Sequence, residues 1–382
     1  MHKVYDLLIL GGGISSCVFA SSLINYGYKG KIAIIENGRD LGGRSSSRNS
    51  LRNNGLKLTH GSPNFNIIKS NNDLLLNNYL NVLIKNNFIK SDESLILELD
   101  KNLDISNYTK NSFYQGDLFV PVNSINYFLK KLIDKGIKRK QLDLYFNTLI
   151  TDLNFKKNNW SVSSKEREIF NAKFIVSSSN LILHKRSKQI LKKKYIPLRE
   201  AIPEGANHNI DNIIALLNKQ NYLERINYLI YTKANYKYKG FYKEENIHFL
   251  LNDKAENKFG FERIIFQKKE FENIGIVIHT KNSSNNSSKK YSVIPNGLLI
   301  KKFNHIFEDS NIINKLINYK DISIMRWRAS QPADVMIPKE LQICEEFKIG
   351  FCGDWFDFSG FGRTEGAIIS ALNLSIKIMN FL

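Results

Sequence analysis

Near its start the chain carries small and acidic residues spaced as a dinucleotide-binding turn requires. Gly11 and Gly13 flank Gly12, Ser16 takes the third small position, and Glu36 lies 20 residues beyond Ser16. The first glycine of such a turn permits a sharp bend, and the next lets backbone N–H groups approach a pyrophosphate. An acid at this distance accepts hydrogen bonds from ribose hydroxyls. These residues predict binding of a nucleotide that has a free 2′-hydroxyl group.

A strand, a helix and a second strand must hold these residues. The apolar run Val4–Leu10 precedes the glycines, and Val18, Leu23 and Ile24 suit a helix packed on a sheet. A second apolar run, Ile32–Ile35, ends directly before the acid. Strand, tight turn, helix and strand form a nucleotide-binding βαβ unit. A Gly-rich turn alone is a weak signal, so it is this context that favours nucleotide binding.

The composition is that of a globular and strongly basic protein. The chain has 382 residues, 42% of them hydrophobic, and a formal net charge of +19. This length allows one large domain or two intimate ones. The three cysteines lack the spacing of a disulfide framework or zinc site, which suits a reducing compartment. The basic residues are spread along the chain, which favours solvated faces and attraction for a phosphate-bearing cofactor or substrate over nucleic-acid binding.

No apolar run reaches the length of a membrane span, so none is expected. The first predicted strand begins a few residues after Met1, which leaves no room ahead of it for a targeting peptide. We therefore expect a cytoplasmic protein.

The middle of the chain predicts two kinds of sheet. Apolar residues at helical spacing over residues 125–133 indicate a helix, with Asn123 as its cap and Gly136 as its stop. Further apolar runs between residues 228 and 279 alternate with polar turns and predict an antiparallel sheet. Three short β-like runs predict a meander that returns to the parallel sheet, at 148–153, 160–163 and 173–177.

The C-terminal end predicts a partner for the first unit. A buried strand over residues 347–352 runs into Gly353-Asp354, and a helix begins near Thr364. Its first turn contains Glu365-Gly366-Ala367. The N-terminus of such a helix favours negative charge nearby.

These features together resemble the flavin-containing amine oxidase superfamily, and within it the renalase-like branch. The turn His60-Gly61-Ser62-Pro63 is similar to that branch's Asp-His-Gly-Ala-Gln turn, although Thr59 stands where Asp is usual. The segment Arg326-Trp327-Arg328-Ala329-Ser330-Gln331-Pro332 is similar to its Arg-Trp-Arg segment that ends in Gln-Pro. Between residues 185 and 320 the resemblance is one of pattern only.

The resemblance implies an α/β fold with FAD as cofactor. The implied fold has two domains. The first is a Rossmann-like FAD-binding domain whose doubly wound sheet is of the GR2 type with a β-meander. The second is an inserted α+β substrate domain with a mostly antiparallel sheet. The FAD-binding domain would comprise residues 1–66, 114–184 and 344–382, and the substrate domain residues 67–113 and 185–343. The implied reaction is hydride transfer from a small substrate to flavin N5, either a dihydronicotinamide species or an amine, with reoxidation by O2 or another acceptor.

The resemblance also implies roles for single residues. The substrate-face candidates are Trp327, Gln331 and His60, and no catalytic residue is assigned. The implied cofactor contacts are Gly11, Gly13, Ile14, Ser15, Glu36, Asn37, Gly43, Arg44, Gly61, Ser62, Ile150, Gly353, Asp354, Glu365, Gly366 and Ala367.

Simpler roles stay open for several of these side chains. Arg44 can pair with a carboxylate instead of a phosphate. Asp354 can be only a turn residue, and Glu365 only a partner of the helix dipole. His60 can satisfy the backbone, and Trp327 can face the core.

Three alternatives for the whole protein also stay open. The enzyme can act on a large apolar molecule such as a carotenoid or porphyrin precursor, which needs a long apolar tunnel. The chain can be a basic module associated with nucleic acid, or it can bind flavin without turnover. Ser16, Ser62 and Ala371 depart from the residues usual in relatives, which bears on the last of these.

Overall fold

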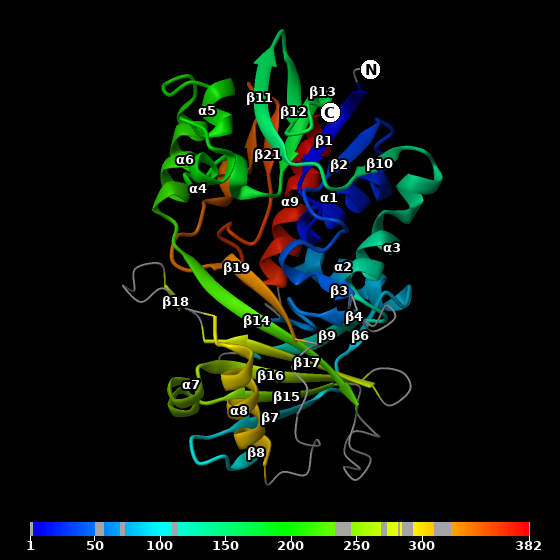
Figure 1. The fold of residues 1–382 in the computed structure, drawn as a ribbon. Helices are drawn as coiled ribbons and strands as arrows, with labels where there is room; N and C mark the ends of the chain where they lie inside the picture. Colours follow the sequence, from blue (N-terminus) through cyan, green and yellow to red (C-terminus); the bar gives the residue numbers. More distant parts are fainter. Residues whose placement is uncertain are drawn as a thin grey trace.

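The computed structural model describes residues 3–49, 57–68, 73–108, 114–233, 246–268, 273–281, 283–284, 293–308 and 322–381. Two sheets stand one beyond the other along the molecule, and the long strands β14 (Tyr222–Lys233) and β19 (Ile322–Pro332) run from the first toward the second (Figure 1). Both chain ends lie with the first sheet.

The first sheet combines parallel strands with an antiparallel meander. Its order is β10-β2-β1-β13-β12-β11, and β21 pairs in parallel with the end of β13. The strands β10, β2, β1 and β13 are parallel, whereas β11, β12 and β13 form the meander. The bounds are β1 Lys3–Leu10, β2 Ile32–Ile35, β10 Leu142–Tyr145, β11 Ile150–Lys156, β12 Asn159–Ser164, β13 Ile169–Ser177, β20 Ile343–Cys344 and β21 Ile349–Phe351.

Both faces of the parallel strands are buried, as parallel sheets require. On β1, Leu7 and Ile9 face one hydrophobic cluster, and Leu8 and Leu10 face another. The first cluster lies under α1 (Ile14–Asn25), α3 (Ile125–Lys138) and α9 (Thr364–Phe381). This alternation explains why the strands read as continuous apolar runs in the sequence.

Helix α3 differs from its prediction at both ends. Its N-cap is Ser124, whose side chain accepts a hydrogen bond from the Tyr127 N–H, and not Asn123. The helix passes through Gly136, which is buried against Ile24 and Leu142, and ends at Lys138. Gly136 therefore serves close packing and does not end the helix.

The second sheet is mostly antiparallel, as predicted. Its order is β18-β14-β17-β16-β15-β7-β8, with β19 on the free side of β14, and β7–β15 is the one parallel pair among its described strands. Helices α7 (Asp253–Phe259) and α8 (Asn296–Phe307) cover one face. The remaining bounds are β7 Leu95–Leu99, β8 Ile105–Asn107, β15 Asn246–Leu251, β16 Phe261–Lys268, β17 Asn273–Thr280 and β18 Ser283–Ser284.

Smaller elements lie between the two sheets. A two-stranded ribbon, β3 (Ser47–Asn49) with β4 (Lys57–Thr59), follows the first βαβ unit. Helix α2 (Leu74–Lys85) packs its apolar side into the cluster under α1 and α9. The order β5-β9-β6 forms a third sheet, with β5 Phe65–Ile67, β6 Ile89–Ser91 and β9 Asp117–Pro121.

Packing suggests one change to the proposed domain division. Residues 185–219 form helices α4 (Arg186–Leu191), α5 (Pro197–Ala201) and α6 (His208–Lys219). Apolar side chains of α5 and α6 join the hydrophobic cluster on the meander side of the first sheet. We therefore propose a boundary near residue 220 instead of residue 185.

Among the described segments, no helix has both the length and the apolar character needed to cross a bilayer.

Candidate functional site

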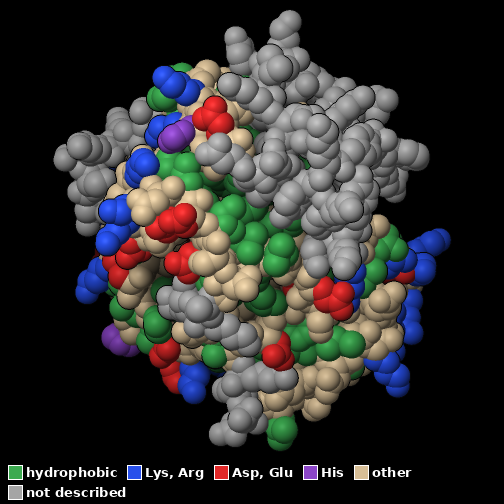
Figure 2. All heavy atoms as spheres, turned by 90° about the horizontal axis from the view of Figure 1, so that it is seen from below, with side chains coloured by type: hydrophobic (Ala, Val, Ile, Leu, Met, Phe, Trp, Pro, Cys, Tyr) green, Lys and Arg blue, Asp and Glu red, His purple; other side chains and the backbone are tan. Residues whose placement is uncertain are grey.

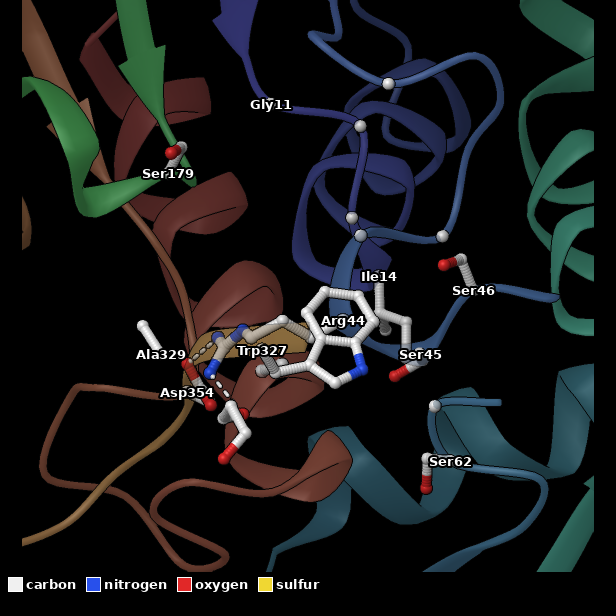
Figure 3. Close-up of a pocket in the computed structure, with 18 of the residues that line it drawn as sticks. Gly11, Ile14, Arg44, Ser45, Ser46, Ser62, Ser179, Trp327, Ala329 and Asp354 are labelled. Carbon is white, nitrogen blue, oxygen red and sulfur yellow. Dashed lines mark hydrogen bonds and ion pairs between the residues drawn. The ribbon is translucent and has the colours of Figure 1, made fainter. Parts of the chain in front are cut away.

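A cavity of about 1390 Å³ lies between the first sheet and the second. Every predicted site residue lines it except Gly353, Glu365 and Gly366. Figure 3 shows Trp327 in the middle of this cavity, with Gly11 and Ser62 on either side and the Arg44–Asp354 pair beside it. The cavity is larger than the roughly 300–1,000 Å³ of ordinary ligand sites.

The glycine turn opens one end of the cavity. Gly11 has a φ of +109°, and a Cβ there would lie 2.7 Å from the Ser178 hydroxyl oxygen, so only glycine fits. A Cβ on Gly13 would meet nothing within 4 Å, because this position faces the cavity. The N-terminus of α1 is thus open to an anion.

Ser16 fills the third position of the turn without crowding it. Its side chain is fully buried, and its hydroxyl donates to the Gly11 carbonyl at 2.6 Å. The same hydroxyl lies 2.5 Å from that of Ser178, the residue after β13. Serine therefore ties the turn to the neighbouring strand.

Glu36 directly follows β2, and its carboxylate is held in place. One oxygen accepts from the Gly12 N–H at 2.6 Å, and the other from the Gly38 N–H at 2.5 Å. The side chain lines the cavity beside Asn37. Two backbone donors thus fix the carboxylate at the position predicted for a ribose.

Arg44 and Asp354 bring the two ends of the chain together. The Arg44 guanidinium lies 2.5 Å from the Asp354 carboxylate and also donates to the Ser330 carbonyl at 3.3 Å. Burial opposes the charge on Arg44, but Asp354 raises the pKa of its guanidinium above the usual value. Arg44 therefore pairs with a carboxylate, which was one of the two roles left open for it. Both side chains border the cavity.

Three predicted contacts, Glu365 and Gly366 at the start of α9 and Gly353 after β21, do not line the cavity. Glu365 is fully buried, accepts from the Ile68 N–H at 3.0 Å and from the Ser359 hydroxyl at 3.1 Å, and burial raises its pKa. Gly366 packs against the Gly360 backbone, and the Gly353 N–H donates to Ser370. These residues shape the turn that presents Thr364, Asp354 and Ala367, which do line the cavity.

His60 and Trp327 form a stacked pair in the cavity wall. Their ring centroids are 5.5 Å apart, and the rings lie 26° from parallel. Burial, with a smaller effect of Arg48, lowers the pKa of His60 to about 4. At neutral pH this imidazole is uncharged, so the pair offers a flat and uncharged surface. Trp327 faces the cavity and not the core.

The far wall of the cavity comes from the second sheet and was not predicted. Asn227, His279 and Arg263 lie opposite one another across β14, β17 and β16. Arg225 lies opposite Trp327 on β14 and β19. Residues directly opposite share one face of a sheet, and residues two apart on a strand do too. One polar face thus points at the cavity, opposite the face under α8.

A β-bulge adds a carboxylate behind this wall. Phe261 and Arg263 pair with the consecutive residues Thr280 and His279, so β16 carries an extra residue there. Phe261 faces the α8 cluster, and Glu262 forms an ion pair with Arg225. The signal in the sequence was a pair of neighbouring charged residues inside each strand, Glu224-Arg225 in β14 and Glu262-Arg263 in β16.

His279 joins the two arginines. Its Nδ1 accepts from Arg263 Nε at 2.9 Å and lies 3.2 Å from a terminal nitrogen of Arg225. Arginine only donates, so the ring proton lies on Nε2. Burial and both guanidiniums hold the pKa of His279 well below its usual value. The Arg263 guanidinium also donates to the Tyr114 hydroxyl at 3.0 Å.

At the end of the molecule formed by the second sheet, the basic residues in view do not form a single patch. Figure 2 shows Lys and Arg there at the margins, with Asp and Glu between them. Among the described residues, no cluster of three or more His, Cys, Asp and Glu side chains is placed to hold a metal ion.

Comparison with known proteins identifies the fold. A model of the NAD(P)-binding Rossmann-like domain matches residues 9–79. No curated protein matches the sequence. The solved structure of a putrescine oxidase with redesigned cofactor binding is similar over 100% of both chains, with a TM-score of 0.61 and 9% identity. The chain has a Rossmann-like FAD-binding fold.

Two further structures agree with this fold. A protein from Exiguobacterium sp. 255-15, provisionally designated a protoporphyrinogen oxidase, has a TM-score of 0.62 at 10% identity over 100% of both chains. A fatty acid isomerase from P. acnes that produces CLA has a TM-score of 0.62 at 10% identity over 98% of both chains. At such identities the likeness concerns the Rossmann-like FAD-binding fold and its second antiparallel sheet.

Proposed function

We propose that this chain is an FAD-dependent oxidoreductase that takes a hydride from a small substrate. One observation carries the proposal. The glycine turn and Arg44 from one end of the chain, and Asp354 and Ala367 from the other, line a single cavity that the second sheet closes. A cofactor held by both ends would face a substrate space against the second sheet.

The residues present fit FAD. Glu36 would accept from the ribose hydroxyls, and the N–H groups at Gly13 and at the start of α1 would bind the pyrophosphate. Arg44 and Asp354, already paired, would bind the phosphates and the ribityl chain. When bound, FAD supplies hydride acceptance, and the chain contributes orientation and exclusion of water.

No side-chain base is needed for such a reaction, because the cofactor takes the hydride. His60 is uncharged at neutral pH and is buried against Trp327. We propose that the two rings orient the substrate. Within this proposal the substrate is a dihydronicotinamide species, as in renalase-like enzymes, or an amine, and O2 reoxidises the cofactor.

The decisive experiment is the visible spectrum of the purified protein, together with its FAD content. Gly13→Val is the sharpest variant, since a side chain there meets no protein atom but enters the cavity. Its backbone, with a φ of −80°, suits any residue. We expect the variant to fold normally and to lose FAD. Gly297→Val, also at an uncrowded glycine, is the matched control and should keep it.

Activity is then tested by anaerobic bleaching of the flavin bands with NAD(P)H isomers and amines. A colourless protein that takes up no FAD would contradict the proposal. A yellow protein that no substrate bleaches would instead indicate flavin binding without turnover.

A further inference from the structure

Arg186 is an arginine of the cavity wall to which the proposed function gives no role. It is the first residue of α4, and its side chain lines the same cavity as the glycine turn and Arg44. Its Nη2 donates to the Asn180 side-chain oxygen at 3.2 Å, and its guanidinium carbon lies 4.4 Å from the centre of the Tyr222 ring. An amide and an aromatic ring thus hold the guanidinium in place.

The groups that hold Arg186 are uncharged. The Asn180 amide nitrogen donates to the Tyr222 hydroxyl, so both ends of this amide have partners. Burial raises the pKa of Tyr222, which keeps its proton at neutral pH. His184 Nδ1 accepts from the Arg186 backbone N–H at 3.0 Å, and burial lowers the pKa of this histidine to about 4. The site is therefore ordered without a negative charge.

Arg186 differs from Arg44 in its partners. Arg44 pairs with Asp354. Of the residues that the structure describes, no carboxylate contacts Arg186, and its Nε is buried without a hydrogen-bond partner. Asp334 is a second carboxylate near Tyr222, but it is exposed, lies outside the cavity lining and accepts from backbone and side-chain amides.

This arrangement costs free energy until an anion enters the cavity. Burial is the main cause that lowers the pKa of Arg186, Tyr222 acts in the opposite direction, and the charge of Arg44 lowers the pKa further. A guanidinium removed from water without an anionic partner is unfavourable. An anion beside Arg186 would compensate this cost.

The position of Arg186 indicates which anion this is. Its partner Asn180 directly follows Ser179, whose N–H donates at 3.2 Å to the carbonyl of Leu10, the residue before the glycine turn. From another side the charge of Arg44 reaches Arg186. Arg186 therefore belongs to the part of the cavity bounded by the glycine turn and Arg44, the two features that would hold the pyrophosphate of FAD.

From this geometry we infer that Arg186 binds a phosphate group of the FAD pyrophosphate, as a second arginine beside Arg44. The inference rests on the proposed function and adds a cofactor-binding residue to it. A guanidinium binds phosphate oxygens through paired N–H donors. Arg44 shares its charge with Asp354, so Arg186 is the arginine of this pair whose charge no described carboxylate neutralises.

A purely structural role is the alternative to be separated. Because Arg186 stacks on Tyr222, it also ties α4 to the start of β14. Loss of such a tie lowers the melting temperature of the apoprotein and weakens every ligand of the cavity alike. Loss of an uncompensated charge does not lower the melting temperature, and it weakens only ligands that carry phosphate.

The test compares FAD with riboflavin, which lacks both phosphates, by quenching of the flavin fluorescence on the apoprotein. In Arg186→Gln we expect the affinity for FAD to fall about tenfold and that for riboflavin to stay within about twofold, because only the charged contact is lost. The melting temperature of the apoprotein should not fall. Unchanged FAD affinity would overturn the inference, and so would equal weakening of both flavins.

Lys188→Gln is the matched control. Lys188 is exposed on the same short helix, so the variant loses the same charge two residues away. It should change neither affinity. If it weakens FAD as much as Arg186→Gln does, the overall positive charge attracts FAD, and the inference is overturned. If Arg186→Gln does not fold, Arg186→Met replaces it with the same expectation, since an unbranched thioether keeps contact with the Tyr222 ring.

Inorganic pyrophosphate identifies the source of the phosphate. It should compete with FAD on the apoprotein and should not bind the FAD-loaded protein, where Arg186 is already engaged. Binding to the loaded protein that Arg186→Gln abolishes would assign Arg186 to a phosphate-bearing substrate and overturn the inference.

The failure of this inference is distinct from that of the proposed function. A wild-type protein that takes up no FAD contradicts the proposed function before any variant is compared. FAD binding that is indifferent to Arg186→Gln contradicts only the role of Arg186.

Discussion

Single residues at the glycine turn were predictable because their roles are local in sequence. Glu36 lines the cavity, and its two oxygens accept from the Gly12 and Gly38 N–H groups. Its role toward a ribose stays a prediction. In Glu36→Gln the amide nitrogen would face one of these donors, which costs about 1–3 kcal/mol for an unsatisfied buried group. We expect FAD affinity to fall at least tenfold and the apoprotein to lose about 1 kcal/mol of stability, measured by FAD titration and urea unfolding.

The same substitution at an exposed acid is the control for this prediction. Glu166→Gln, in the turn between β12 and β13, should leave both quantities unchanged. Unaltered FAD affinity in Glu36→Gln would contradict the ribose role of Glu36.

The partner of Arg44 could not be predicted from local sequence, because Asp354 lies 310 residues away in sequence.

At the scale of elements, hydrophobic spacing predicted which segments are helices and strands, but not their ends. Ser124, and not Asn123, accepts from the Tyr127 N–H at the start of α3. Ser124→Ala should therefore lower the free energy of unfolding by about 1 kcal/mol, a normal loss for an N-cap. Asn123→Ala should change it by less than about 0.5 kcal/mol, as surface substitutions do. Urea unfolding of both variants decides, and a larger loss in Asn123→Ala would restore the original prediction.

The wall of the second sheet shows why other parts of the site escaped prediction. Arg225, Arg263 and His279 come from three strands whose register decides that they meet, and a bulge at Phe261–Arg263 re-aims one of them. Strand periodicity alone would place residues 261 and 263 on one face, and the bulge separates them. Strand register and β-bulges depend on tertiary packing, so they cannot be predicted from the local pattern of a single sequence.

At the scale of the whole molecule, four buried histidines couple folding to pH. Burial is the main cause that lowers the pKa of each one, to about 4 for His60, His184 and His248 and well below the usual value for His279. Between pH 6.5 and 4 the unfolded chain therefore binds protons that the folded chain does not. Stability is highest above this window and falls as the pH drops through it, by about 1.4 kcal/mol per pH unit for each histidine fully engaged.

Urea unfolding at intervals from pH 7 to pH 5 measures this slope together with the opposite contribution of Glu365 and Glu256, whose pKa burial raises. The histidine contribution is therefore obtained by comparing variants. This range lies above the region where the carboxylates with lowered pKa, such as Asp6 and Asp211, lose their contribution, because that loss begins only near their usual value of 3.8. His248→Gln should reduce the proton uptake on unfolding by up to one, whatever it does to stability itself. His305→Gln, at an exposed position on α8, should leave the slope unchanged. The Nδ1 atom of His248 lies 3.0 Å from the Tyr114 hydroxyl oxygen, and the ring is fully buried. Equal slopes in all three proteins would mean that His248 is not held neutral in this environment.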